Sequence, residues 1–300
     1  MKKTILQKII DNFIYFEITL MIISALSSFF TFYQYFSERN NNIVFGIVTI
    51  IVSLFIIILA VKHIYHLRDS YNRIMSKTSD CFHKLNHNLR DTFFDTKRLN
   101  ETNILTIDYL TEKFISKVKD CVNYLSDTLS SLTGKEVNVC IKVFEPTKNG
   151  NPYDENNAYI STLCRSSNSQ STRTNKDKIS KVIDNTDFSI ILFEGASEFY
   201  QVDLNEYLKN NEYRNSNKLW KKQYKCTIVV PIRIGNKFLN GGDDNMYDIM
   251  GFVCVDSNSI DTFTNYNILY YVDIVKSFSD ALYKYFKQYE VFISQLKVTV

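Results

Sequence analysis

Two stretches of the sequence decide the fold: Tyr224–Ile234 reads YKCTIVVPIRI, and Ile249–Ser257 reads IMGFVCVDS. Both are rich in β-branched residues, which favour strands. The segment between them, Gly235–Tyr247, contains adjacent glycines and adjacent aspartates, a composition typical of a loop. We therefore expect a β-hairpin with strands at Cys226–Ile234 and Ile249–Val255.

Outward from this hairpin, the spacing of apolar residues predicts further strands and two long helices. Apolar and polar residues alternate through Glu136–Glu145 (EVNVCIKVFE), which indicates a strand. Gly134 is expected to end the preceding helix, and Thr102 is its candidate N-cap. Helix, strands and a closing helix in this order indicate an α+β domain with a central antiparallel sheet flanked by helices. The remaining expected elements are strands at Tyr159–Cys164 and Phe188–Phe193 and helices at about Ile107–Leu132 and Tyr266–Leu296.

The hairpin residues, with Phe263 and the long final helix, resemble the GAF domain family. That family shows a strand ending in VPI, then a strand of the form IGxLxxDS, then a phenylalanine before the last helix. The resemblance covers about residues 102–286. The chain also resembles divergent GAF-like modules of bacterial membrane proteins. Their TxxR stretch corresponds to Thr162–Arg165, and their N-T-x-F stretch corresponds to Asn185–Phe188. Their Y-x-N…W…Y stretch corresponds to Tyr213, Asn215, Trp220 and Tyr224.

The resemblance implies a sensor. GAF domains bind small molecules, often cyclic nucleotides, in a pocket between sheet and helices, or they serve as dimerisation modules. This sequence lacks the NKFDE-type signature of cyclic-nucleotide-binding members, and it has no cysteine with an adjacent histidine to attach a bilin. The resemblance therefore indicates the fold and leaves the ligand open.

Two apolar runs near the N-terminus predict membrane-spanning helices at about residues 13–36 and 43–64. Each is long enough to cross about 30 Å of hydrocarbon, and the short loop between them, Ser37–Asn42, makes them a helical hairpin. Lysine and arginine flank both outer ends, which places both termini in the cytoplasm of a bacterial cell, with the chain in the inner membrane. A signal peptide is the alternative for the first run, but no small-residue cleavage site follows it.

Residues 66–101 continue from the second span as an amphipathic helix without proline or glycine, which we interpret as a stalk. Its apolar stripe needs a partner. The same stripe on another copy is our first expectation, which makes the chain a homo-oligomer, and the chain's own globular domain is the alternative. The expected division is a transmembrane hairpin at 1–65, the stalk, and a cytoplasmic GAF-like sensor domain at 102–300.

Two stretches are basic, Arg165–Lys181 and Lys209–Lys225, and the second is interleaved with Tyr213, Trp220 and Tyr224. Positive charge beside aromatic rings suits an anionic ligand such as a nucleotide or short oligonucleotide. A solvated loop face, or attraction to the anionic inner leaflet, explains the same charges without a ligand. The candidate ligand-binding residues are Arg165, Arg173, Asn185, Tyr213, Asn215, Trp220, Lys221 and Tyr224.

Nothing in the sequence indicates an enzyme. It contains no P-loop and no GxSxG motif, and all four histidines lie between residues 63 and 87, next to the predicted membrane segment. His83 and His87 have the i, i+4 spacing of a metal pair, but no other cluster supplies further ligands, so no metal and no cofactor are expected. The six cysteines are scattered, without a CxxC pair, and we interpret them as core thiols in a reducing compartment.

Our first functional hypothesis is a ligand-gated membrane effector. The GAF-like domain senses an anionic small molecule, nucleotide or short nucleic acid and controls an oligomeric pore, as in bacterial anti-phage systems of the Hailong type, an analogy of architecture. The alternative is a membrane-tethered sensor or scaffold that docks a separate output protein and has no pore, with spans that face lipid. The pore-lining candidates are Glu17, Ile47, Ile51, Leu54 and Ile58.

Overall fold

The structure is a computed structural model. It describes residues 24, 27, 30, 33, 34, 42–101, 106–145, 157–169, 179–210, 213–233, 249–264 and 267–298. The chain divides into two compact units, Met1–Ser76 and Lys77–Val300. Helix α2 (Asn42–Glu101) contributes to both of them.

In the N-terminal unit, α2 begins at the predicted second span and runs on through the predicted stalk without a break. A two-helix hairpin was expected, whereas the described residues show one long helix. The first predicted span, with Glu17, lies outside the described residues apart from isolated positions, and Arg173 lies outside them as well.

One described helix, Ile50–Leu99, is long and apolar enough to cross a membrane. Its most apolar window has a mean hydropathy of 2.2, and none of that window is buried. The side chains of Ile51, Leu54 and Ile58 are all more than half exposed. Ile47 belongs to the same helix, but its side chain is not among those that the structure describes. The length and exposed apolar surface of this helix are sufficient to cross a membrane; a membrane anchor and a multi-pass topology stay predictions.

In the second unit, six strands form one sheet in the order β3-β2-β1-β6-β5-β4, with every neighbouring pair antiparallel. The predicted hairpin is confirmed, because β5 and β6 pair along their whole lengths. The two short edge strands, β3 and β4, were not predicted, since so few residues show no alternation. The strands are β1 (Asn138–Phe144), β2 (Tyr159–Arg165), β3 (Ser180–Lys181), β4 (Phe199–Gln201), β5 (Cys226–Arg233) and β6 (Ile249–Ser257).

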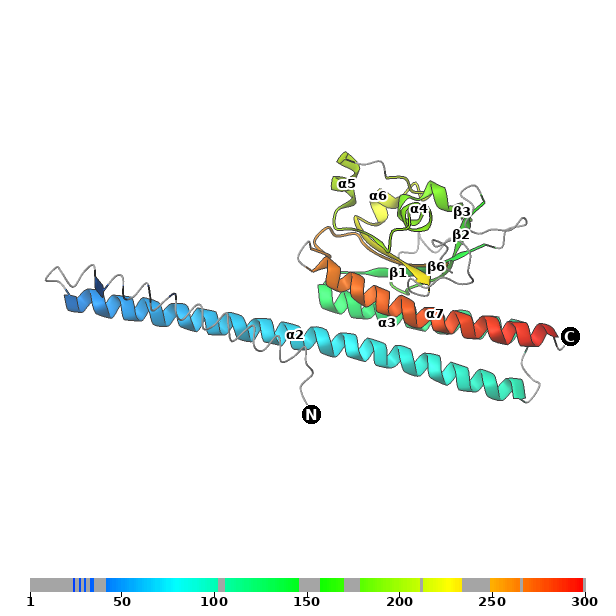
Figure 1. Cartoon of the computed structure of the whole chain (residues 1–300), viewed down its shortest axis with the longest axis horizontal. Coiled ribbons are helices and arrows are strands. Elements are labelled where there is room, and N and C mark those ends of the chain that lie inside the picture. Colours follow the sequence, from blue (N-terminus) through cyan, green and yellow to red (C-terminus); the bar gives the residue numbers. More distant parts are fainter. Residues whose placement is uncertain are drawn as a thin grey trace. The chain divides into compact units, whose positions relative to one another are not determined.

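Helices α3 (Ile107–Thr133) and α7 (Ile268–Val298) cover one face of this sheet (Figure 1). Each presents an amphipathic stripe, and Leu125 of α3 and Phe278 of α7 are fully buried. The periodicity of the sequence predicted both helices within about two residues of their observed ends.

The ends of α3 show which capping signals the sequence carries. Gly134 follows the helix with a φ of 67°, a left-handed conformation that favours glycine, so the predicted end is confirmed. The N-cap is Thr106 rather than the predicted Thr102, because the Thr106 hydroxyl accepts a hydrogen bond from the Tyr109 N–H at 3.2 Å.

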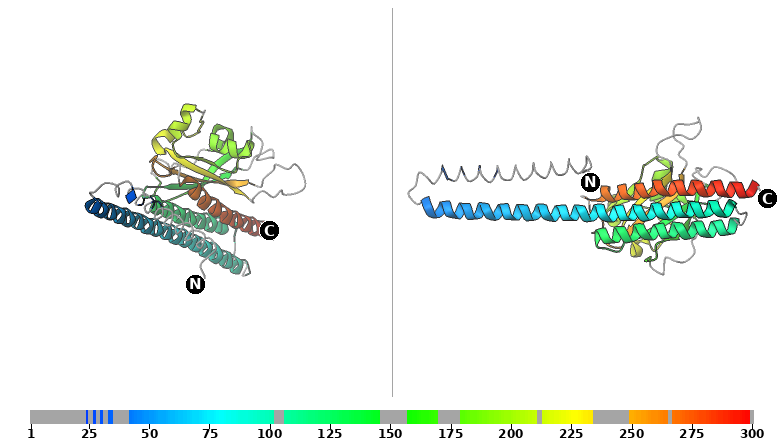
Figure 2. Two further views of the ribbon diagram at one scale, coloured as in Figure 1. Left: turned by 60° about the vertical axis from the view of Figure 1, so that its left-hand side comes forward. Right: turned by 90° about the horizontal axis from the view of Figure 1, so that it is seen from below.

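The part of α2 within the second unit, Lys77–Glu101, lies alongside α3 and α7 (Figure 2). Asn88 donates a hydrogen bond to the Lys117 carbonyl at 3.1 Å, and the rings of Phe93 and Phe292 are 5.9 Å apart. Leu85, from the predicted apolar stripe, is fully buried. The chain's own domain therefore covers this part of the stripe, and oligomerisation stays a prediction.

The opposite face of the sheet carries shorter elements: η2 (Val182–Asp184), α4 (Thr186–Phe193), α5 (Leu204–Asn210) and α6 (Trp220–Gln223) (Figure 1). Their aromatic and aliphatic side chains form a core with the sheet residues beneath them. The domain thus has a layer of long helices, a sheet, and a layer of short helices and loops.

The predicted strand at Phe188–Phe193 is wrong, because these residues belong to helix α4. An apolar run of this length fits a buried strand and a buried helix equally well. Two local features favour the helix. The Asp187 carboxylate accepts the Phe188 N–H at 3.0 Å in the first turn, and Gly195, with a φ of 75°, follows the last turn.

Candidate functional site

A polar pocket lies between the sheet and the layer of short helices. Its volume is about 80 Å³, which is room for several water molecules. The covering wall comes from the segment before α4, from the start of α4, and from residues 215–217 with Tyr224. The sheet supplies the floor, with Cys140, Lys142, Arg165, Thr227, Cys254 and Asp256.

The register of the sheet explains why these floor residues meet. Arg165 lies directly opposite Cys140, and Cys140 lies directly opposite Cys254. Asp256 lies opposite Thr227 on the other side of β6. Because directly opposite residues of antiparallel strands project from the same face, the register brings a guanidinium, two thiols and a carboxylate into one small area.

A β-bulge accounts for the T-x-x-R spacing in β2. The partners of β1 step from Cys164 to Thr162, which leaves Leu163 opposite no residue of β1. One extra residue changes the alternation, so Thr162 and Arg165 come to the same face although they are three residues apart. There the Arg165 guanidinium donates a hydrogen bond to the Thr162 hydroxyl at 3.2 Å.

Asn185 fastens one side of the covering wall. Its Oδ1 atom accepts hydrogen bonds from the Ser216 N–H at 3.0 Å and the Ser216 hydroxyl at 2.9 Å, and its amide donates to the Lys181 carbonyl at 2.8 Å. Beside it, the Thr186 and Arg214 backbones are joined by a hydrogen bond of 3.0 Å. Asn185 is only 2% exposed, so its hydrogen bonds hold two loops together in the absence of competing water.

Asn215 fastens the other side. Its amide donates to the Tyr224 hydroxyl at 2.6 Å and to the Tyr213 hydroxyl at 3.2 Å, and its Oδ1 accepts the Asn217 N–H at 2.9 Å. Asn217 in turn donates to Gln223 at 2.7 Å. The wall is therefore held by side-chain hydrogen bonds rather than by a regular element, and it is pre-organised for binding.

Charges of both signs converge on the pocket. Lys142 and Arg165 supply the positive charges, and Asp187 and Asp256 supply the carboxyl groups. Asp187 is 4% exposed, and its burial raises the pKa of its carboxyl to about 7, although the Phe188 N–H donates to it. Near neutral pH this carboxyl passes between a hydrogen-bond donor and an anion, which suits a ligand that has an anionic group and a hydrogen-bonding group.

Four of the residues proposed from the sequence line this pocket: Arg165, Asn185, Asn215 and Tyr224. Trp220 and Tyr213 lie instead in the aromatic core above the sheet, with ring centroids 4.9 Å apart.

Lys221 is exposed, with its ammonium 5.7 Å from the centre of the Trp220 ring. Most of the second basic stretch, including Arg214, Lys218 and Lys222, is likewise exposed to solvent.

Sequence reasoning missed the pocket residues that come from the central strands β1 and β6. Lys142 and Cys140 lie two residues apart in β1, and Cys254 and Asp256 do the same in β6, so period-two alternation places each pair on one face. The alternation of residues along a strand does not show which face lines the polar pocket, because apolar residues occupy both faces of these central strands. Asp187 was missed with the wrong strand assignment of its segment.

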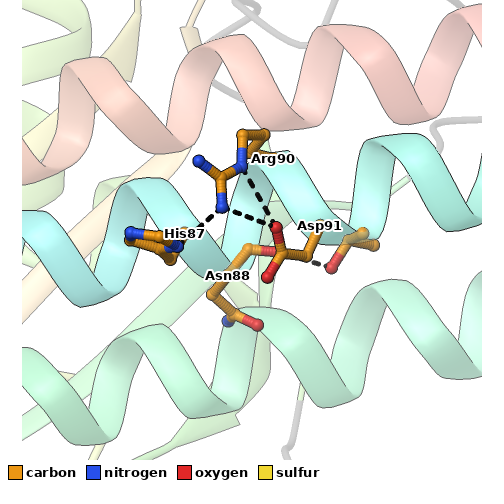
Figure 3. Close-up of polar contacts among 5 residues, drawn as sticks. His87, Asn88, Arg90 and Asp91 are labelled. Carbon is orange, nitrogen blue, oxygen red and sulfur yellow. Dashed lines mark hydrogen bonds and ion pairs between the residues drawn. The ribbon is translucent and has the colours of Figure 1, made fainter.

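His83 and His87 on α2 do not form a metal site with other described residues. The rings of His83 and His87 are 4.3 Å apart, but an Arg90 Nη2 donates to His87 Nδ1 at 2.7 Å and also contacts Asp91 at 3.0 Å (Figure 3). A guanidinium bound to the imidazole opposes a second cation. Among the described residues, no group of three or more metal-ligating side chains occurs.

No protein-family model and no curated protein matches the sequence. Solved structures of GAF domains and related proteins are similar to the chain in fold. One is the type II free methionine-R-sulfoxide reductase of Thermoplasma acidophilum, at 14% identity and a TM-score of 0.36, covering 59% of this chain and 96% of that one.

Two further GAF domains are similar at 12% identity each. The PixJ GAF domain of Thermosynechococcus elongatus, in its blue-light-absorbing form, covers 62% of this chain and 94% of its own, with a TM-score of 0.36. The phycoerythrobilin-bound GAF domain of a cyanobacterial phytochrome covers 62% and 97%, with a TM-score of 0.35. The second unit thus resembles GAF domains, and at these values the likeness carries nothing about ligand or activity.

Proposed function

We propose that this chain is a membrane-anchored sensor whose GAF-like domain binds a small polar ligand in the pocket between the sheet and α4. The observation that carries the proposal is the convergence of Arg165, Lys142 and the buried Asp187 on one pre-organised cavity. Buried charged groups are costly unless they are paired, so such a cluster in a cavity is typical of a binding site.

The ligand we propose carries a phosphate or carboxylate group, held by Arg165 and Lys142, and a polar group that faces Asp187. A cavity of about 80 Å³ favours a small molecule or one end of a nucleotide over a longer nucleic acid. The proposed role of the pocket residues is to hold and orient the ligand, without a catalytic step.

The test is binding to the full-length protein in detergent, measured calorimetrically with inorganic phosphate, nucleoside monophosphates and amino acids as probes. We expect one of these classes to bind, and Lys142→Met to weaken that binding by about tenfold or more, because a hydrogen bond to a charged group contributes about 1.5–3 kcal/mol. Lys221→Met removes an exposed charge outside the pocket and is the matched control. Equal losses in the two variants would refute the pocket as the site.

For the output, we propose that ligand binding controls an oligomeric pore built from the apolar helix, in the manner of an anti-phage effector. The support is the continuous helix α2, which contributes both to the sensor unit and to the exposed apolar segment with Ile51, Leu54 and Ile58. Ion flux from vesicles that contain the protein, dependent on the ligand and reduced by Leu54→Asn, is the expected result. Stable capture of a partner protein without flux would instead favour the tethered scaffold.

A further inference from the structure

Cys140 and Cys254 form a cross-strand thiol pair in the floor of the pocket. The two residues lie directly opposite each other on β1 and β6, and both line the cavity. They are 5% and 7% exposed, and the cavity that they line is the access route that the described residues show.

The backbone geometry places this pair within reach of a disulfide. The N–H and C=O of Val139 both bond to Ser166 beside β2, at 3.0 and 2.8 Å, so the N–H and C=O of Cys140 point the other way, toward Cys254. In such a hydrogen-bonded antiparallel pair the Cα atoms are about 5.5 Å apart. Disulfides form at Cα separations of about 4.4–6.8 Å, so the Cα spacing of this pair is in range, and closing the bond brings the Cβ atoms from about 4.5–5.5 Å to about 3.5–4.5 Å.

The electrostatic surroundings distinguish this pair from the other cysteines. A hydrogen bond with Cys254 lowers the pKa of the Cys140 thiol, and the charge of Arg165 lowers it further. Burial and the same hydrogen bond raise the pKa of Cys254. Burial raises the pKa of Cys121, Cys164 and Cys226 to about 12, and it also raises the pKa of Cys81. Thiolate character is therefore concentrated on one cysteine of the pair.

We propose that Cys140 and Cys254 are a reversible oxidation site, at which a small hydroperoxide that enters the pocket converts the thiol pair into a disulfide. This inference goes beyond the proposed function, because the oxidation does not require the small polar ligand proposed for the pocket.

The reaction is a two-electron oxidation. The Cys140 thiolate attacks the terminal oxygen of the hydroperoxide, an S–O bond forms, the O–O bond breaks, and the leaving alkoxide or hydroxide takes a proton and departs as alcohol or water. Cys254 then loses its proton and attacks the Cys140 sulfur, the S–S bond forms, and the sulfenic hydroxyl leaves as water. Two thiols and one hydroperoxide thus give one disulfide, one alcohol or water, and one further water.

The experiment treats the full-length protein in detergent with hydrogen peroxide, alkylates the remaining thiols under denaturing conditions, and identifies peptides by mass spectrometry. We expect one intrachain disulfide between Cys140 and Cys254, formed at least about tenfold faster than modification of any other cysteine. Dithiothreitol restores both thiols.

Two variants test the order of the steps. In Cys254→Ser the resolving thiol is absent, so a 1,3-dione probe traps a sulfenic acid on Cys140. In Cys140→Ser, Cys254 gives no such adduct, because its own pKa is raised. Cys164→Ser removes a buried thiol outside the pocket and forms the disulfide like the wild-type protein, as the matched control.

Recovery of all six thiols after peroxide treatment of the wild-type protein would overturn the proposal. Equal adducts in the two pocket variants would overturn the assignment of Cys140 as the attacking thiol. The wild-type measurement needs no substitution, so it stands even if a variant fails to fold.

Discussion

The two faces of the sheet are stabilised in different ways. The face covered by α3 and α7 buries apolar stripes, and side chains such as Leu125 and Phe278 have no exposed surface. The other face is covered by short helices and loops, which Asn185 and Asn215 hold in place around a polar cavity. Both faces bury apolar side chains, so the comparison indicates that both stabilise the domain and that the polar, titratable groups gather on the pocket face.

The largest expected effect lies on the helical face. Phe278→Ala is expected to lower the free energy of unfolding by about 3–5 kcal/mol, because it leaves a cavity in a fully buried core. Urea unfolding of the full-length protein in detergent measures this through the fluorescence of Trp220, the chain's only tryptophan. Leu269→Ala, on an exposed position of the same helix, is the control, and equal losses would contradict core burial as the cause of the Phe278→Ala effect.

On the pocket face, Asp187 is expected to make stability depend on pH. The folded state holds the proton up to a pKa of about 7, whereas the unfolded carboxyl releases it near 3.8. The folded state therefore binds more protons between these values, and stability falls as pH rises through that window, by at most about 1.4 kcal/mol per pH unit.

Asp187→Asn removes this dependence, because an amide does not ionise. The free energy of unfolding of both proteins is measured at a series of pH values between about 4 and 8. The stability of the variant relative to the wild type is expected to increase as pH rises. The exposed Asp261→Asn serves as the comparison. Parallel curves for wild type and Asp187→Asn would show that this carboxyl titrates normally.

A smaller loss is expected from Asn185→Ala, about 2 kcal/mol, since the substitution leaves the Ser216 N–H and the Lys181 carbonyl without their side-chain partner. Asn185→Asp keeps the acceptor but places a carboxylate oxygen against the Lys181 carbonyl in a buried site, so it is expected to cost at least as much as Asn185→Ala. The same urea titration measures both. If Asn185→Ala weakens binding of a pocket ligand without lowering stability, the wall is a binding device and not a structural one.

The smallest effect belongs to a helix end on the apolar face. Thr106→Ala removes the N-cap of α3 and is expected to cost about 1 kcal/mol. Thr106→Ser keeps a capping hydroxyl and is expected to restore most of that loss. A neutral Thr106→Ala result would mean that tertiary packing alone fixes where α3 begins.

Periodicity in the sequence predicted the helical face well, because α3, α7 and the central strands have long, regular apolar patterns. It failed where segments are short. The run at Phe188–Phe193 has too few residues to separate helix from strand, and β3 and β4 have too few to show alternation.

The pocket was predicted only in part for a related reason. Motif residues such as Arg165 and Asn185 line it, but Lys142, Cys140 and Cys254 become neighbours through strand register, which one sequence does not specify. Trp220 was proposed as a ligand contact from its basic surroundings, and it packs in the core because a large aromatic side chain gains more from burial.

The short edge strands have a consequence for assembly. The sheet ends on one side in the two residues of β3 and on the other in the three residues of β4. Among the described residues, edges this short offer little backbone for another strand to pair with, which protects a β-rich domain from edge-to-edge aggregation. Copies of this chain that associate would therefore do so through helix surfaces, and such complexes would dissociate without disturbing the sheet.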